Sequence, residues 1–203
     1  KIAIAHLRSA SPYGQNNFYD EPRGDGGKES PADFETRTWR ERLHYDDKGI
    51  VFIPPMAFKN CITEAARFLG RKIPGRRNAT YTKHFEAGVL VLEGLSLGIH
   101  KNKVPGQWLF LPSDGVRGSG KRVKKCMPRI DQWEGKVTFH VLDDTITKDV
   151  FADHLREAGS FIGLGFFRPR NNGFWGRFTV QSVEWQDEAE KQEKILNALQ
   201  AVL

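Results

Sequence analysis

The chain has 203 residues, of which 39% are hydrophobic and 28% are charged, which excludes a disordered chain and allows one domain with a buried core. The 31 Lys and Arg residues exceed the 25 Asp and Glu residues, and the net charge of +6 favours a polyanionic partner. The sequence contains neither a signal-like segment nor an apolar run of about 18 residues, so we expect a soluble, cytoplasmic protein with no membrane partner.

The first half of the chain predicts two strands and one helix. Residues 1–7 alternate and are rich in aliphatic side chains, which indicates a strand, whereas residues 9–33 have the composition of a loop insertion. Residues 34–44 fit a short helix or an exposed strand equally well. Residues 50–53 predict a buried strand that ends at the two prolines that follow.

The helix that we expect next has a single apolar stripe. Its members recur at helical spacing, and Gly70 follows where a C-terminal glycine belongs. The stripe consists of Phe58, Cys61, Ile62, Ala65 and Leu69.

The second half of the chain predicts a similar order of elements. Residues 85–97 indicate a strand with a bulge or bend, residues 108–111 another strand, and residues 136–142 a cleanly alternating strand. Thr147 is suited to cap a helix that runs to residue 158 and stops at Gly159. A terminal helix is expected over about 187–203.

These two β-α-β halves predict an α+β fold with a ferredoxin-like, RNA-recognition-type antiparallel sheet and two main helices. Extended basic loops and the C-terminal helix complete the prediction. We expect a single domain over residues 1–203, with loop insertions at about 9–33 and 112–131.

Two basic segments contain no acidic residue that could neutralise them locally. The first, residues 71–84, contributes Arg71, Lys72, Arg76, Arg77 and Lys83. The second, residues 115–130, contributes Arg117, Lys121, Arg122, Lys124 and Lys125. Such runs are often only solvated loops, but they also suit a sugar-phosphate chain.

A third segment, residues 159–180, combines glycines, arginines and aromatic residues. Guanidinium groups bind phosphate oxygens and aromatic faces stack on bases, so the segment is a candidate nucleic-acid contact. The simpler interpretation is a tight β-hairpin turning at residues 171–173, with Phe174 and Trp175 packed inward, and for the turn itself we favour it. The candidate contacts here are Arg168, Arg170, Asn172, Phe174, Trp175 and Arg177.

No cofactor or metal site is expected. Gly115, Gly120 and Lys121 match part of a phosphate-binding loop, but Arg122 stands where a magnesium-binding hydroxyl is required. Cys61 and Cys126 form no metal-ligand spacing, and we expect both thiols to be reduced.

Three stretches together resemble the RAMP superfamily, especially the backbone subunits of CRISPR effector complexes: the first strand, residues 51–69 and residues 162–180. Ile53, Pro54 and Lys59 match the first motif, although residues 55–57 and Asn60 depart from its glycine and hydroxyl positions. The glycines of 163–176 with Arg177 match the second motif better. The resemblance implies a subunit that binds a guide RNA by its backbone and stacks with copies of itself or other effector subunits, and it places Lys59 at the strand.

Three classes of function follow. The preferred one is binding of single-stranded RNA, with DNA as the alternative, as a repeating subunit of a ribonucleoprotein. The second is a metal-independent RAMP endoribonuclease, for which His84 is the candidate general base. Asp143 and Asp144 are more typical of a turn than of a metal site. The third is an interaction protein that imitates such a subunit to inhibit or modify an effector complex.

Overall fold

The computed structural model of the chain describes residues 1–113 and 120–187. Its centre is a four-stranded antiparallel sheet with the strand order β3-β7-β1-β8. The strands are β1 (Ile2–Ser9), β3 (Val89–Leu90), β7 (Glu134–Val141) and β8 (Phe178–Gln186).

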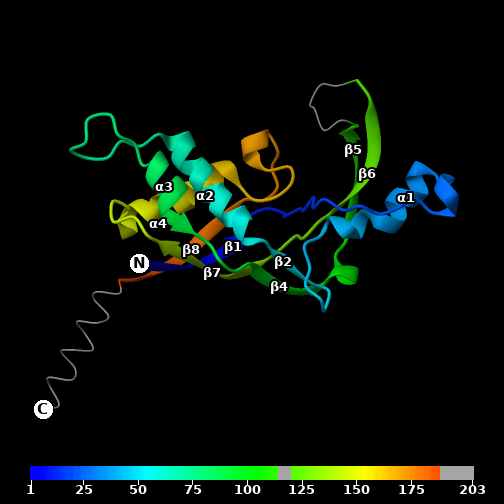
Figure 1. Cartoon of the computed structure of the whole chain (residues 1–203), viewed down its shortest axis with the longest axis horizontal. Coiled ribbons are helices and arrows are strands. Elements are labelled where there is room, and N and C mark those ends of the chain that lie inside the picture. The colour runs from blue at the N-terminus through cyan, green and yellow to red at the C-terminus, as the bar shows by residue number, and fades with distance from the viewer. Residues whose placement is uncertain (114–119, 188–203) are drawn as a thin grey trace, which may run out of the picture.

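Three helices connect these strands and lie on one face of the sheet (Figure 1). The chain passes from β1 to β3 through α2 (Pro55–Leu69) and α3 (Thr82–Gly88), and from β7 to β8 through α4 (Lys148–Glu157). Two β-α-β units with this strand order form a ferredoxin-like fold, which confirms the predicted fold class.

The core lies between the sheet and the helices. Ala3, Ala5 and Leu7 of β1 are fully buried on the helical face, since alternate residues of a strand point to opposite faces. Phe139 of β7 packs edge-on against Phe151 of α4, with ring centroids 5.2 Å apart. The face of the sheet that the helices cover is therefore apolar and buried, whereas the opposite face is open.

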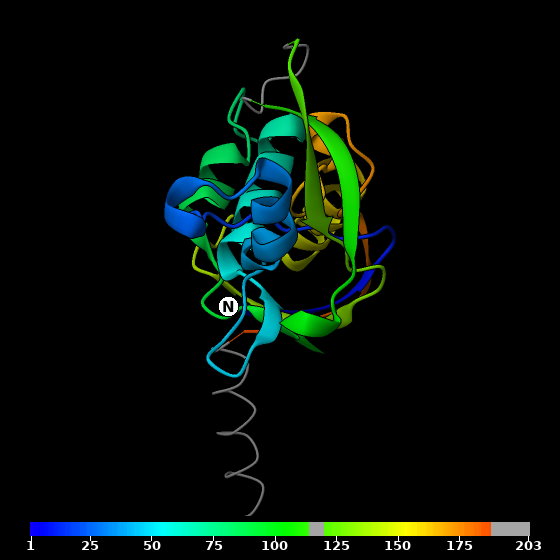
Figure 2. The ribbon, with the colours of Figure 1, turned by 90° about the vertical axis from the view of Figure 1, so that its right-hand side faces the viewer.

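Two insertions extend the ferredoxin-like core. The first holds the 3-10 turns Asp25–Gly27 and Trp39–Arg42, the helix α1 (Pro31–Thr38) and the strand β2 (Ile50–Ile53). The second holds β4 (Leu95–His100), the 3-10 turn Lys101–Lys103, β5 (Gly106–Pro112) and β6 (Arg122–Pro128). β2 pairs with β4, whereas β5 and β6 form a hairpin (Figure 2).

Several local predictions are confirmed. The strand predicted at residues 1–7 is β1, and the one at 50–53 is β2. Four of the five stripe residues of α2 are buried in the core, all except Leu69, and the helix ends at Gly70 in the left-handed conformation (φ 54°). Thr147 caps α4, since its hydroxyl accepts a hydrogen bond from the Val150 amide.

The strand predicted over residues 85–97 is wrong. The segment begins inside α3, then forms the short β3, and enters β4 only at Leu95. Tyr81, the N-cap of α3, and Phe85 are buried four residues apart, a spacing that places side chains on one face of a helix. Phe85 also stacks on His154 of α4 with ring centroids 4.4 Å apart, and this contact between helices was not visible in the local pattern.

The helix stop predicted at Gly159 agrees with the end of α4 at Glu157 to within two residues, but helical structure does not stop there. The chain continues through a π-helical turn, Ala158–Ile162, and leaves it at Gly163 (φ 73°). Gly159 serves a different purpose: a Cβ there would lie 2.2 Å from the Phe178 carbonyl oxygen, so only glycine lets this turn approach β8.

The expected β-hairpin at residues 171–173 is instead the 3-10 turn Pro169–Asn171, followed by Asn172 in the left-handed conformation (φ 56°). The second expected loop insertion, 112–131, contains the strand β6 over Arg122–Pro128. The C-terminal helix expected over about 187–203 falls on residues 188–203, outside the described residues. Within the described ranges, no helix is long and apolar enough to cross a membrane.

Candidate nucleic-acid interface

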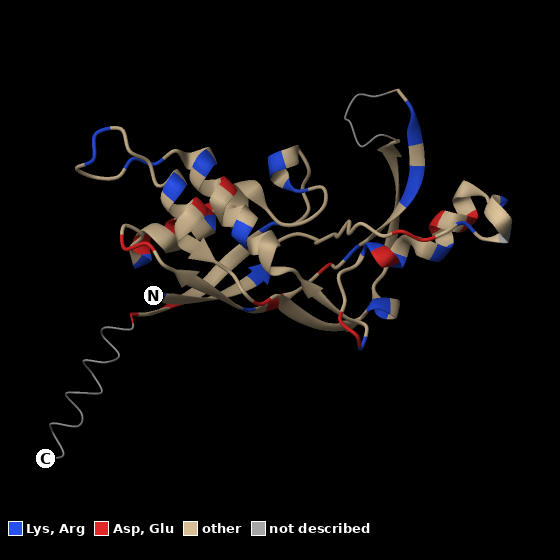
Figure 3. Cartoon of the chain, in the orientation of Figure 1, with Lys and Arg blue, Asp and Glu red and all other residues tan. Residues whose placement is uncertain are grey.

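Lys and Arg residues from three distant segments lie on the helical side of the sheet (Figure 3). The segments are the loop between α2 and α3, the loop around Pro169–Asn171, and the strand β6. Figures 1 and 2 show that all three extend to this same side, which we call the basic side. Tertiary structure thus aligns along one side cations that are up to about a hundred positions apart in the chain.

The loop between α2 and α3 is anchored at its base and exposed at its tip. Ile73 is buried and its amide donates to the Ala79 carbonyl at 2.8 Å. Arg76 and Arg77 are exposed beyond this anchor. Arg71, nearer the base, pairs with Asp153 of α4 at 3.3 Å, so a residue distant in the chain supplies the acid that the segment itself lacks.

The β5–β6 hairpin carries aromatic rings beside its cations. Directly opposed residues of an antiparallel pair share one face, and the register places Phe110 opposite Lys124 and Trp108 opposite Cys126. Phe110 is 68% exposed and Trp108 is 42% exposed. The Lys124 ammonium lies 5.0 Å from the centre of the Trp108 ring.

Sequence reasoning missed Trp108 and Phe110 as candidate contacts. The available signal was their alternation within residues 106–112, followed by the Lys- and Arg-rich strand with which they pair. The candidate Arg117 lies between these strands, outside the part of the chain that the structure describes.

The arginines of the third segment are partly neutralised. Arg168 and Arg170 both contact Glu64 of α2, at 2.8 and 3.0 Å. The guanidinium of Arg177 donates to the carbonyl oxygens of Ser160 and Phe174, at 3.3 and 3.2 Å. A distant helix therefore supplies the acid that the local sequence lacks.

The glycines of this segment serve packing between backbones. A Cβ at Gly176 would lie 2.0 Å from the Leu164 carbonyl oxygen, and one at Gly173 would lie 1.8 Å from that of Phe167. The Leu164 amide donates to the Gly176 carbonyl at 2.9 Å. These contacts explain the glycine density without a bound phosphate.

Two predicted contacts of the third segment remain accessible and one does not. Phe174 is 59% exposed, and Asn172 is exposed beside it. Trp175 is 2% exposed and packs edge-on against Phe166 and Phe167, so its ring cannot stack on a base. The prediction that Trp175 contacts nucleic acid is therefore corrected.

Lys59 is a structural lysine. Its ammonium donates to the carbonyl oxygens of Phe85 and Glu86, both at 2.7 Å, and to the Thr63 hydroxyl at 2.9 Å. Burial lowers the pKa of Lys59, although the neighbouring Glu86 acts in the opposite direction. Because three protein oxygens take its three donors, Lys59 ties α2 to α3 instead of facing a strand as the resemblance implied.

The open face of the sheet presents ion pairs. Glu134 lies 2.8 Å from His6 and 2.7 Å from Arg8, and Lys136 lies 3.0 Å from Glu184. Neighbouring strands thus neutralise one another here. Among the described residues, this face shows none of the exposed aromatic rings on which RNA-recognition-type sheets stack bases, so it is a weaker candidate than the basic side.

Most cations of the basic side form no ion pair with any carboxylate in residues 1–113 and 120–187. These cations can bind phosphates without first breaking an ion pair to a carboxylate of the protein. The set comprises Lys72, Arg76, Arg77, Lys83, Lys121, Arg122, Lys124 and Lys125.

His84 of α3 forms a close pair with a carboxylate. Its Nδ1 lies 2.6 Å from Oδ2 of Asp143, which follows β7. Partial burial acts to raise the pKa of Asp143, but hydrogen bonds from His84 and Thr145 outweigh burial and lower it. A carboxylate on Nδ1 leaves Nε2 as the basic nitrogen, which is the arrangement of a general base.

The described residues contain no cluster of three or more His, Cys, Asp or Glu residues able to hold a metal ion. The carboxylate of Asp144 forms an ion pair with the Lys1 ammonium instead, at 3.0 Å. Both cysteines are free and buried. Burial raises the pKa of Cys61 to about 12 and also raises that of Cys126, so neither thiol is a ready nucleophile.

No protein-family model and no curated protein matches the chain. Among solved structures, a chain described as "CRISPR RNA-guided surveillance complex" is similar, with a TM-score of 0.36 and 11% sequence identity. The similarity covers 90% of this chain and 68% of that chain. A likeness of this size does not establish a shared function, and the ferredoxin-like topology is evident from the strand order of this chain itself.

Proposed function

We propose that the protein binds single-stranded nucleic acid, with RNA as the preferred form, along the basic side. The observation that supports this most directly is that unpaired cations from the α2–α3 region and from β6 lie on one side of the sheet. Cations hold the phosphates of a strand irrespective of its sequence, and exposed rings stack on its bases. The β5–β6 hairpin offers both, with Phe110 and Trp108 on the face that carries Lys124.

We further propose that the chain is a single RAMP-like domain, residues 1–203, acting as a repeating subunit of a ribonucleoprotein of CRISPR type. The ferredoxin-like topology and the glycine-rich motif that ends at Arg177 support this proposal. The partners would be copies of the chain or other effector subunits. The DNA-binding form and the inhibitor that imitates such a subunit remain the alternatives.

Salt dependence of binding tests the basic side. For a single strand, the slope of log affinity against log salt changes by about 0.7 for each phosphate contact. We expect Arg122→Gln combined with Lys124→Gln to reduce the magnitude of the slope by about 1.4, because two contacts are lost. Fluorescence anisotropy of a labelled strand across a salt series measures this.

Lys136→Gln is the matched control, since Lys136 is an exposed cation on the open face that pairs with Glu184. It should leave the slope unchanged. Equal slopes for the wild type and the double variant would contradict the proposal. Light scattering of the same samples distinguishes nucleic-acid binding from the inhibitor alternative. Assembly that is the same with and without nucleic acid would indicate that the protein acts through protein contacts.

A second candidate function is RNA cleavage, which the 2.6 Å pair of His84 and Asp143 favours. If Nε2 of His84 removes the proton from a 2′-hydroxyl, His84→Ala should lower the cleavage rate about 100-fold or more, whereas Asp143→Asn should lower it less. Denaturing gels of labelled RNA without divalent metal measure the rate. His154→Ala is unsuitable as the control, since His154 is fully buried, whereas the half-buried His100 is suitable. Equal cleavage by wild type and His84→Ala would exclude the candidate.

A further inference from the structure

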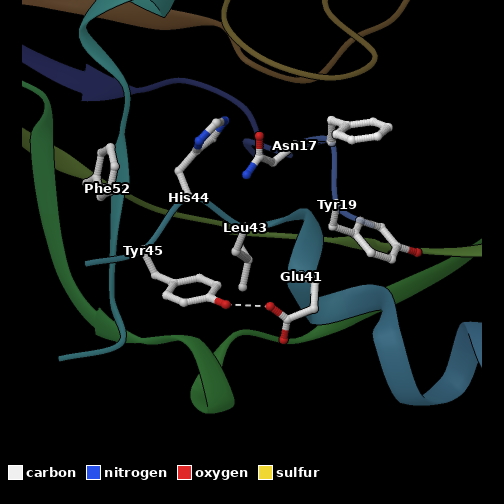
Figure 4. A pocket seen from close by; sticks show the side chains of 8 residues that line it. Asn17, Tyr19, Glu41, Leu43, His44, Tyr45 and Phe52 are labelled. Atoms are coloured by element: carbon white, nitrogen blue, oxygen red, sulfur yellow. Dashed lines mark hydrogen bonds between the residues drawn. The ribbon is translucent and has the colours of Figure 1, made fainter. Parts of the chain in front are cut away.

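A hollow of about 270 Å³ lies between the segment after β1 and the segment that leads into β2 (Figure 4). Its walls include the side chains of Phe18, Tyr19, Tyr45 and Phe52. Sites for whole drug-sized ligands usually measure about 300–1,000 Å³. The hollow therefore matches a smaller guest with a planar ring.

Buried hydrogen bonds hold the walls in place. The side-chain amide of Gln15, which is 2% exposed, donates to the Phe52 carbonyl and accepts from the His44 amide, both at 2.7 Å. The backbone amide of Asn17 donates to the Arg42 carbonyl at 2.9 Å. These backbone groups already have hydrogen-bond partners within the protein. A guest would therefore contact side chains, on walls that are in place before it binds.

The hollow carries little net charge. The carboxylate of Glu41 accepts a hydrogen bond from the Tyr45 hydroxyl and lies 3.3 Å from the Lys101 ammonium. Burial lowers the pKa of His44, which keeps its imidazole neutral at pH 7. A phosphate would find no free cation among these groups, whereas an uncharged heterocycle needs none.

Two polar side chains remain available to a guest. Asn17 and His44 lie side by side at one end of the hollow in Figure 4, and neither side chain has a hydrogen-bond partner among residues 1–113 and 120–187. An amide presents a donor and an acceptor together, which fits the N6 and N7 edge of adenine. The ring of Phe18 is 87% exposed at the same hollow, and an aromatic ring so exposed is suited to stack on a base.

We propose that this hollow binds a single adenine base, held by the Asn17 amide and stacked on the neighbouring aromatic rings. This proposal rests on the proposed function where the adenine is part of a bound strand. The hollow would then add a preference for adenine to binding that is otherwise directed at the phosphates. Free adenosine presents the same ring without a strand and tests the hollow alone.

Asn17→Ala removes the side-chain amide that would recognise adenine. It should not disturb the fold, since this side chain has no hydrogen-bond partner in the described structure. We expect wild type to bind adenosine about 10-fold more tightly than cytidine in calorimetric titrations, and Asn17→Ala to lose this preference. Labelled strands of oligo-A and oligo-C of equal length should show the same preference by anisotropy. Asn16→Ala is the control, because Asn16 is an exposed neighbour that does not line the hollow.

The outcomes separate the two proposals. Strands that bind without any adenine preference, or a preference that survives in Asn17→Ala, would overturn the adenine site and leave backbone binding intact. Adenosine binding that Asn17→Ala abolishes, in a protein to which no strand binds, would support the site and remove the proposed function. Loss of self-assembly in Asn17→Ala, with adenosine binding absent from the wild type, would instead assign the hollow to a protein side chain.

Discussion

Glu35→Gln is expected to destabilise the protein by about 3–5 kcal/mol, because it leaves the Arg42 guanidinium buried without a counter-charge. Glu35 and Arg42 are 6% and 5% exposed, and their facing nitrogen and oxygen atoms lie 3.0 and 3.1 Å apart. The same carboxylate accepts the Cys126 amide of β6 at 2.7 Å. One buried acid on α1 therefore fixes both the following turn and the hairpin.

Urea unfolding at pH 7 measures this effect. Arg8→Gln is the control, since it breaks an exposed pair with Glu134 and should have a much smaller effect on stability. Replacing both partners, as in Glu35→Leu with Arg42→Met, should recover much of the loss because no charge is then buried. A Glu35→Gln variant as stable as Arg8→Gln would show that the buried charge of Glu35 does not contribute to the stability of the protein.

Gly176→Ala is the second substitution with a large expected effect, about 3–5 kcal/mol of destabilisation. Its φ of 79° costs an L residue about 1–2 kcal/mol, and the added Cβ would lie 2.0 Å from the Leu164 carbonyl oxygen. The two backbones would have to separate, which breaks the hydrogen bond from the Leu164 amide to Gly176. Arg177 and the exposed Phe174 would move with them.

Gly75→Ala separates the two contributions in the same unfolding assay. Gly75 has a φ of 77°, almost that of Gly176, but no atom lies within 4 Å of the position of an added Cβ. It should therefore show only the conformational cost of about 1–2 kcal/mol. If both variants lose the same free energy, the close packing of the glycine-rich loop does not contribute to stability.

The candidate interface was only partly predictable from the sequence. Exposed cations such as Arg76 and Lys124 could be identified, since acid-free runs stay at the surface. The sequence could not show that Glu64 neutralises Arg168 and Arg170, because this pairing joins α2 to a loop about a hundred residues later. It also could not show that Trp108 and Phe110 share a face with Lys124, which depends on the register of β5 with β6.

The sequence by itself determined most of the ferredoxin-like skeleton of this protein, although the bounds of β3 were not predicted. Alternation in β1 and β7, the stripe of α2 and the cap at Thr147 are local patterns, and each element buries the face that its own pattern makes apolar. Only the tertiary structure decided which charged and aromatic groups remain available. Lys59 and Trp175 are engaged by residues distant in the chain, and the hollow beside Asn17 exists only because β2 and the segment after β1 meet there.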